Sequence, residues 1–238
     1  MAWEIQVKVN EKLYLRNPEL SELGKNILFK GAKMIDEMGL EEFTFKKLAT
    51  ALSTNESSIY RYFESKHRLL LYFFEWYWRW MEYQLGYHTH NVADPEKKLE
   101  IVIKVLTLKQ ENMISDGEEI DKLALHRIVI KEASKTYLTR HVKEDNEKQF
   151  FKPYKDFNAK LADIIKSYSP NYKFARSLSS TLIEMSHYQY FFMHHLPSLT
   201  DFGINKDENE MMNFLLDLAL SSKKAPFVSV MSDRKFGS

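Results

Sequence analysis

The stretch at 44–70, TFKKLATALSTNESSIYRYFESKHRLL, contains three helix start signals in close succession. Thr44, Asn55 and Ser65 each carry a side-chain oxygen that can cap a helix N-terminus. After the first of them, apolar residues recur three and four positions apart, at Phe45, Leu48, Ala49 and Leu52. The polar run that begins at Ser53 interrupts this pattern, because such side chains compete for backbone hydrogen bonds. The stretch therefore predicts two short helices joined by a tight turn, followed by a third helix.

Two short helices joined in this way form a helix-turn-helix, whose second helix can enter the major groove of DNA. Ile59 and Phe63 face inward on the second helix, so its outward residues are Glu56, Ser57, Ser58, Tyr60 and Arg61. Short hydroxyl side chains allow close approach to base edges, arginine can pair with guanine, and tyrosine can donate to a phosphate. Lysines and arginines outnumber glutamates by five to two in this stretch, and such a local excess suits phosphate contact.

The stretch also carries a recognisable combination of motifs. They are Thr44 at a helix start, Ala49 inside that helix, the run Ile59-Tyr60-Arg61-Tyr62-Phe63 and the pair Ser65-Lys66. With these motifs, residues 19–71 resemble the DNA-binding domain of the TetR family of transcriptional repressors. One departure is the turn, where members of that family usually carry Gly-Val and this chain has Ser53-Thr54. The resemblance implies DNA contacts at Thr44, Phe45, Glu56, Ser57, Ser58, Tyr60, Arg61, Tyr62 and Lys66.

The fold that the resemblance implies is all-α. We expect an N-terminal arm at 1–18, a three-helix helix-turn-helix domain at 19–71, a larger helical ligand-binding and dimerisation domain at 72–222, and a tail at 223–238. We expect the arm to pack on the domain that follows it, because its lysines and arginine are balanced by glutamates. The implied function is transcriptional regulation, in which a small molecule releases the protein from its operator.

Composition agrees with long helices, because the 238 residues include only 7 Gly and 6 Pro. A hydrophobic content of 44% with 28% charged residues is typical of a globular protein. The absence of cysteine excludes disulfides and thiolate metal sites, and it fits a cytoplasmic protein. No signal peptide is evident and no apolar run approaches the roughly 20 residues of a membrane-spanning helix, so no membrane association is expected.

Start signals, stop signals and apolar periodicity predict the remaining helices. They lie at 17–39, 65–87, 95–113, 123–137, 150–168, 174–196 and 208–220. The helix at 65–87 is apolar on nearly every side, so we expect it to be packed on several sides. Asp116-Gly117 is expected to form a turn, and the charged stretch at 143–149 is interpreted as a solvated turn.

The last two predicted helices carry apolar residues on more than one face, which is what a homodimer interface requires. In the resembling family these two helices form a four-helix bundle with those of a second subunit. The candidate interface residues are Leu178, Leu182, Met185, Phe192, Met211, Phe214, Leu215 and Leu218. A homodimer with two recognition helices requires double-stranded operator DNA that is nearly palindromic.

The chain contains 16 Phe, 13 Tyr and 4 Trp, and these rings need either thick packing or a wide pocket. The TetR resemblance implies that some of them border a ligand cavity. The candidate lining residues are Trp76, Trp80, Tyr83, Tyr154, Phe157, His187, Gln189 and Tyr190. Because few ionisable groups lie on the buried stripes, we expect a small hydrophobic effector. The alternative is that these rings simply fill the core.

No common catalytic or phosphate-binding motif occurs, so no catalytic residue, metal site or cofactor is predicted and an enzyme is not expected. The pairs His88/His90 and His194/His195 lack further ligands at suitable spacing and are interpreted as surface histidines. Two other functions remain open at this point. One is a helical enzyme that binds a hydrophobic substrate between Trp76 and Phe192, and the other is an all-helical scaffold that binds only protein. The operator, the effector and the sign of regulation do not follow from the sequence.

Overall fold

A computed structural model describes residues 7–107 and 120–223, and within these ranges the chain is helical and has no strand. The α-helices are α1 (Glu22–Glu42), α2 (Phe45–Ala51), α3 (Glu56–Tyr60), α4 (Lys66–Thr89), α5 (Pro95–Leu106), α6 (Lys122–Glu132), α7 (Ser134–Tyr137), α8 (Val142–Glu147), α9 (Lys152–Tyr168), α10 (Ala175–His195) and α11 (Glu208–Leu220). The all-α prediction is confirmed. Within the described part of the chain, no helix is long and apolar enough to cross a bilayer.

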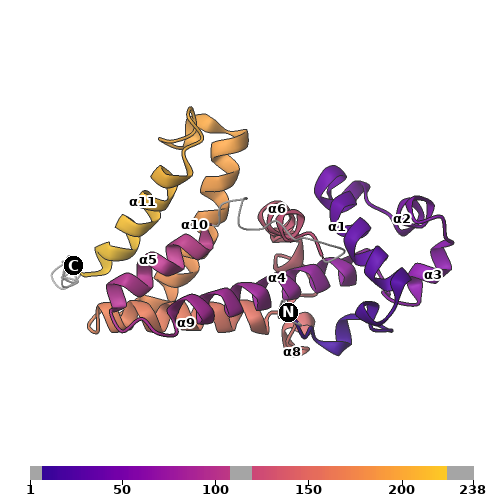
Figure 1. Ribbon diagram of the computed structural model, residues 1–238, viewed down its shortest axis with the longest axis horizontal. Coiled ribbons are helices and arrows are strands. Elements are labelled where there is room, and N and C mark those ends of the chain that lie inside the picture. The colour runs from indigo at the N-terminus through magenta and orange to yellow at the C-terminus, as the bar shows by residue number, and fades with distance from the viewer. Residues whose placement is uncertain (1–6, 108–119, 224–238) are drawn as a thin grey trace, which may run out of the picture.

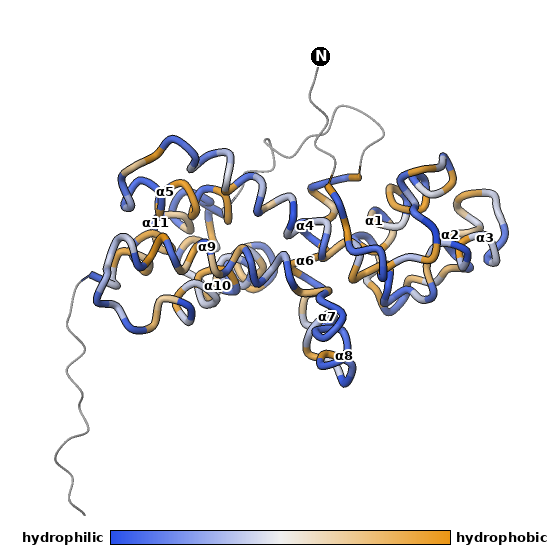
Figure 2. Tube along the Cα trace, turned by 90° about the horizontal axis from the view of Figure 1, so that it is seen from below, coloured by the Kyte–Doolittle hydropathy of each residue, from blue (hydrophilic) through white to orange (hydrophobic). Residues whose placement is uncertain are grey.

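The molecule is elongated, with α1, α2 and α3 at one end and α10 and α11 toward the other (Figure 1). Helix α4 runs between the two ends and packs against α1, α5, α6 and α9. Every residue from 69 to 78 in α4 is buried, which confirms the predicted packing on several sides. Seen from below, α7 and α8 project to one side between the two ends (Figure 2).

The start of α1 differs from the prediction. Asn17 does cap Pro18–Leu20, but that segment is a separate 3₁₀ turn, and Ser21 with extended backbone then caps the long helix. The turn folds back on α1 so closely that a Cβ on Gly24 would lie 2.2 Å from the carbonyl oxygen of Pro18. Leu20, which falls within the predicted helix at 17–39, lies in this turn, and its side chain is 77% exposed.

The N-terminal arm packs on the protein over its described part, as expected. Leu13, in the 3₁₀ turn η1 (Glu11–Leu13), is buried. The backbone N–H of Asn10 donates to Oε1 of Glu75 on α4 at 3.0 Å, and its side-chain amide donates to the carbonyl of Lys148 at 3.0 Å. The arm thus connects α4 with the segment that follows α8.

The C-terminal half is built from α5, α9, α10 and α11. Helices α5 and α9 pack on α4 and on each other, α10 packs on α9 and α11, and α11 packs on α5. The predicted starts of α5 at Asp94-Pro95 and of α11 at Glu208 are confirmed. The predicted solvated turn at 143–149 is wrong, because 142–147 forms α8 and buries Asp145. The predicted turn at Asp116-Gly117 and nearly all of the predicted tail lie outside the described residues.

Candidate nucleic-acid interface and its connections

The predicted caps place α2 and α3. Thr44 Oγ1 accepts a hydrogen bond from the backbone N–H of Lys47 at 3.1 Å, which starts α2. Asn55 Oδ1 accepts from the backbone N–H of Ser58 at 2.9 Å, which starts α3. The same oxygen accepts from the hydroxyls of Ser57 and Ser58 at 2.6 and 2.8 Å. Asn55 therefore orients both serines at the start of the helix expected to contact bases.

The turn between these helices closes through Ser53, which has a φ of 51°. The N–H of Ser53 donates to the carbonyl of Thr50 at 3.1 Å, and the N–H of Thr54 donates to the carbonyl of Ala49 at 2.9 Å. A left-handed residue at a helix end is usually glycine, because a side chain is strained there. The departure from the family pattern at Ser53 thus coincides with the residue that adopts the strained conformation.

The outward face of α3 is exposed as predicted. Ser57, Tyr60 and Arg61 are exposed, while Ile59 below them is fully buried. The ring of Tyr60 packs edge-on against Phe45, with 5.0 Å between the ring centroids, so its hydroxyl is held at the surface. Thr44, Glu56 and Ser58 lie at the same surface, exposed or partly exposed.

Two of the predicted DNA contacts are wrong as direct contacts. Phe45 is 4% exposed and Tyr62 is 2% exposed. The Tyr62 hydroxyl is 2.8 Å from Ser21 Oγ, and its carbonyl accepts from the N–H of Leu15 at 2.8 Å. Both residues support the interface from beneath.

Lys66 also differs from its predicted role as a phosphate contact. Its ammonium group donates to the carbonyls of Leu40, Glu41 and Phe43 at 2.8, 3.0 and 3.1 Å. A lysine has three donors, and all three are engaged at the end of α1. Lys66 therefore anchors α4 to α1, while the exposed Lys46, Lys47 and Arg61 carry positive charge at the surface.

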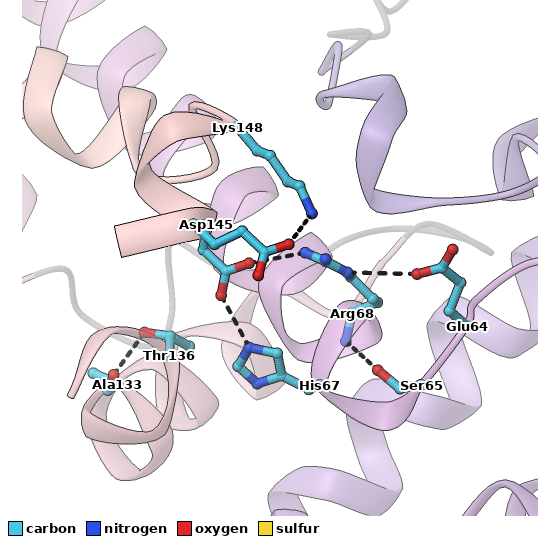
Figure 3. A network of polar contacts seen from close by, with 9 residues as sticks. Glu64, Ser65, His67, Arg68, Ala133, Thr136, Asp145 and Lys148 are labelled. Atoms are coloured by element: carbon cyan, nitrogen blue, oxygen red, sulfur yellow. Dashed lines mark hydrogen bonds and ion pairs between the residues drawn. The ribbon is translucent and has the colours of Figure 1, made fainter. Parts of the chain in front are cut away.

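A buried carboxylate connects α8 to the start of α4 (Figure 3). Asp145 Oδ1 accepts from Arg68 Nη1 at 3.0 Å, and Asp145 Oδ2 lies 3.4 Å from His67 Nε2. The guanidinium of Arg68 also lies 4.8 Å from the centroid of the Phe150 ring. His67 and Arg68 lie in the first turn of α4, the helix that follows α3 in the chain. This network therefore joins α8, in the C-terminal half, to the start of α4.

A second connection joins α6 to α1. Arg127 and Lys131 both contact Asp36, at 2.6 and 3.0 Å. Glu132 Oε1 accepts from the backbone N–H of Leu40 at 3.0 Å, next to Gly39 with a φ of 77°. The sequence contains no local signal for either connection, because the partners lie more than 70 positions apart.

Three of the predicted ligand-binding residues lie together in the interior. The rings of Tyr154, Phe157 and His187 surround Trp78 at centroid distances of 4.8, 5.3 and 5.9 Å. Neither nitrogen of His187, nor Nε1 of Trp78, has a hydrogen-bond partner among the described residues. Burial lowers the pKa of His187 to about 4. We call Trp78, Tyr154, Phe157 and His187 the Trp78 cluster.

The Trp78 cluster is bordered by further polar groups, which the sequence analysis did not predict. The hydroxyls of Tyr154 and Tyr137 both donate to Glu184, at 2.6 and 3.0 Å. His126, whose pKa burial lowers to about 3, lies 2.9 Å from the hydroxyl of Tyr77. The interior thus contains more ionisable groups than we expected from the apolar stripes of the predicted helices.

The other predicted ligand-binding residues are dispersed. Tyr190 reaches the edge of the cluster through His126, with 5.6 Å between the rings. Trp76 and Trp80 are buried elsewhere along α4, and Gln189 contacts Met185 on its own helix. Tyr83 is 44% exposed and lines a surface groove.

The predicted dimer residues divide into two groups. Leu178, Leu182, Met211 and Leu215 are buried within the subunit, so their assignment to an interface is wrong. Met185, Phe192 and Leu218 are partly exposed and Phe214 is 41% exposed. Sequence periodicity could not separate the two groups because both faces of α10 are apolar.

Residues that the prediction missed extend the outer group. Tyr188 is 50% exposed and stacks on Phe192, with 6.0 Å between the ring centroids. Leu196 and Leu199 beyond them are also exposed. Met185, Tyr188 and Phe192 recur three and four positions apart, so they form one apolar stripe on the outside of α10.

Comparison with known proteins gives one matching family and two similar folds. The sequence profile of the family described as "Bacterial regulatory proteins, tetR family" matches residues 27–73. No curated protein sequence matches the chain. The fold is similar to that of AibR in complex with isovaleryl coenzyme A and operator DNA, with a TM-score of 0.57 and 16% identity, over 81% of this chain and 98% of that one. It is also similar to the ketosteroid transcriptional regulator KstR2 of Mycobacterium tuberculosis, with a TM-score of 0.55 and 13% identity, over 90% and 97% of the two chains.

Proposed function

Since its helix-turn-helix domain makes this chain a member of the tetR family of bacterial regulatory proteins, we propose that it is a transcriptional regulator that binds operator DNA as a homodimer. The observation that carries the proposal is the exposed face of α3, on which Ser57, Tyr60 and Arg61 stand clear of a buried Ile59. No catalytic role is proposed, and a cytoplasmic location is part of the proposal.

At the DNA, Arg61 pairs with a base edge in the major groove, and Ser57 and Ser58 allow close approach of the helix start. Tyr60 donates to a phosphate, as do the exposed Lys46 and Lys47 on the neighbouring helix. Lys66 acts indirectly, because it holds α4 against the end of α1 and so sets the position of α3.

The homodimer forms through the outer residues of α10 and α11. The stripe of Met185, Tyr188 and Phe192, together with Phe214 on α11, supplies apolar surface that a second copy would cover. A two-fold pair presents two α3 helices to DNA, so the operator is expected to be nearly palindromic.

We place the effector at the Trp78 cluster. Unpartnered buried polar atoms cost roughly 1–3 kcal/mol each, and a ligand that hydrogen-bonds His187 and Trp78 would recover part of this energy. Rings supply the rest of the lining, which suits a largely apolar molecule. Of the two similar proteins, AibR binds isovaleryl coenzyme A, whose acyl group is apolar, and KstR2 is a ketosteroid transcriptional regulator.

Release from DNA follows from a population shift. A ligand that separates the rings of the Trp78 cluster moves α9 and α10 against α4, and the conformation that accommodates it becomes the populated one. The Asp145 network and the Asp36 ion pairs carry this change to α4 and α1. The recognition helices then no longer match the operator.

Selection from random double-stranded DNA followed by gel shift tests the proposal. Arg61→Ala is expected to weaken binding to the selected site by about 1–3 kcal/mol and to relax one base position. Arg176→Ala is the matched control, because it removes one exposed positive charge from α10 at a distance from α3. Absence of any enriched sequence, or equal affinity of Arg61→Ala and the wild type, would overturn the proposal.

A further inference from the structure

A groove of about 920 Å³ runs along the C-terminal part of α4, away from the helix-turn-helix. We call it the α4 groove and define it by Lys8, Arg79, Tyr83, Gly86, Tyr87 and Lys160. Lys8 comes from the N-terminal arm and Lys160 from α9, so three separate segments form its walls. Its volume is within the range of small-molecule sites, about 300–1,000 Å³.

Two exposed tyrosines form an aromatic surface in the α4 groove. Tyr83 and Tyr87 lie one helical turn apart, with ring centroids separated by 6.2 Å and planes inclined by 17°. Their exposed fractions are 44% and 68%, so neither ring contributes its full area to the core. Parallel exposed rings of this kind are suited to stacking on a planar heterocycle.

Positive charge surrounds these rings. Lys8, Arg79 and Lys160 line the groove, whereas Glu82 is the single carboxylate among its described lining residues. Glu82 Oε1 accepts from Lys160 Nζ at 2.7 Å, and so fixes that lysine at the wall. The remaining cations are available to an anion, and phosphate is well matched to arginine and lysine donors.

Arg79 is held in place without being fully neutralised. Its Nη2 lies 3.2 Å from Oε1 of Glu75, which is buried beneath the arm. Burial raises the pKa of Glu75 to about 7, so near neutral pH this carboxyl carries only part of a negative charge. The guanidinium therefore keeps a net positive field toward the groove.

Gly86 lies in the wall of the groove next to open space. A Cβ at this position would meet no atom within 4 Å, so close packing does not require the glycine. Glycine inside a helix costs about 0.5–1 kcal/mol relative to alanine. Its consequence is an open surface on α4 within the groove.

We propose that the α4 groove binds a nucleoside phosphate, with the base on Tyr83 and Tyr87 and the phosphates between Lys8, Arg79 and Lys160. A purely apolar ligand would leave the cations unused, and inorganic phosphate would leave the rings unused. The site is separate from the DNA interface and from the Trp78 cluster, so this proposal and the proposed function can each fail without the other.

Isothermal titration of the full chain with ADP, adenosine and pyrophosphate tests the proposal. ADP is expected to bind at least tenfold more tightly than either fragment, because only ADP uses both halves of the groove. Tyr87→Ala is expected to weaken ADP binding by about five- to hundredfold through lost stacking. Gly86→Leu is expected to block the site by filling the open space, whereas Gly86→Ala keeps it open and serves as the matched control. Both substitutions retain the helix, because alanine and leucine are strong helix formers.

Two outcomes would overturn the proposal. One is the absence of ADP binding to the wild type at about millimolar concentration. The other is equal ADP affinity of Gly86→Leu and Gly86→Ala, which would place the nucleotide elsewhere, for example on the lysines beside α3. Gel shift of the same variants with selected DNA reports on the proposed function separately, and Gly86→Leu is expected to bind DNA like the wild type.

Discussion

At the scale of single residues, Ser53 has a strained backbone conformation in the turn between α2 and α3, next to the proposed DNA-binding surface. Its φ of 51° lies in the left-handed region, which costs a residue with a side chain about 1–2 kcal/mol. Neighbouring hydrogen bonds from Ser53 and Thr54 to the end of α2 hold the turn in this conformation. The geometry of the helix-turn-helix is therefore maintained against a backbone preference.

Ser53→Gly is expected to increase the free energy of unfolding by about 1 kcal/mol, because glycine adopts this conformation without a steric penalty. Urea denaturation followed by circular dichroism measures the change. Ser53→Ala is the control, since alanine lacks the freedom of glycine and is expected to bring no gain. Equal stabilities of the glycine and alanine variants would show that the turn is unstrained.

His187 is a second residue whose environment makes a testable difference. In the folded protein burial lowers the pKa of His187 to about 4, so the ring stays neutral down to about that pH. In the unfolded chain the ring has a pKa of about 6.5 and takes up a proton below that pH. Stability contributed by neutral His187 is therefore complete above pH 6.5 and is lost as the pH falls toward 4. His126, with a pKa of about 3, adds a loss of the same sign.

His187→Leu is expected to reduce the difference in unfolding free energy between pH 7 and pH 5 by about 2 kcal/mol. The same change removes two unpartnered nitrogens, so no large loss of stability at pH 7 is expected. Gln189→Leu is the control on the same helix, and it leaves the pH dependence unchanged. An unaltered pH dependence in His187→Leu would mean that this histidine has the same pKa in the folded and unfolded states.

At the scale of secondary-structure elements, α8 has a role out of proportion to its length. It positions Asp145, which is 2% exposed, against Arg68 and His67 at the start of α4. A buried carboxylate is tolerated only when it is paired, and here its partners come from the other half of the molecule. Through Asp145, helix α8 therefore joins the segment before α9 to the start of α4, next to the helix-turn-helix.

Asp145→Ala is expected to destabilise the protein by about 3–5 kcal/mol, because Arg68 is left without its buried partner. A double-mutant cycle with Arg68→Ala is expected to show a coupling of at least about 1 kcal/mol. Glu144→Ala, which removes an exposed carboxylate on the same helix, is expected to change stability by less than about 0.5 kcal/mol. Additive effects of the Asp145 and Arg68 substitutions would show that the pair does not join α8 to α4.

At the scale of the whole molecule, the two ends have different surfaces. The α2–α3 end carries exposed cations and hydroxyls, whereas the outer sides of α10 and α11 carry Tyr188, Leu196 and Phe214. Helix α4 lies between them and is buried along most of its first half (Figure 1). Among the described elements, α4 and the α6 and α8 connections join the two ends, so they are the routes by which a change in packing at one end can reach the other.

Phe214→Glu and Tyr188→Glu are each expected to produce monomers in light scattering at micromolar concentration, because a charge on the α10 stripe or beside it on α11 would be buried in the dimer. Leu20→Glu places the same charge on a side chain that is 77% exposed at the opposite end of the chain, and it is expected to leave the dimer intact. If both stripe variants remain dimeric, the interface lies elsewhere.

Much of the helical framework followed from the sequence alone, and the reason is that its signals are local. Thr44, Asn55 and Ser65 each cap a helix: the side-chain oxygen accepts a hydrogen bond from the backbone N–H three positions later. Start signals and apolar residues predicted helices at 65–87 and 150–168, close to the observed α4 and α9. The TetR family was likewise recognisable from one continuous stretch.

Only the tertiary structure decided how the polar residues were used. Lys66 and Arg68 belong to the positive stretch in the sequence. In the structure Lys66 donates to three carbonyls at the end of α1, and Arg68 pairs with Asp145. Leu182 and Leu215 have the same apolar character as Phe214, but they fill the core of the subunit while Phe214 remains exposed. Short-range interactions determine where a helix begins and ends, because they act between residues a few positions apart. Which face becomes buried, and which charge finds a partner, depends on residues tens of positions away, and no local pattern specifies them.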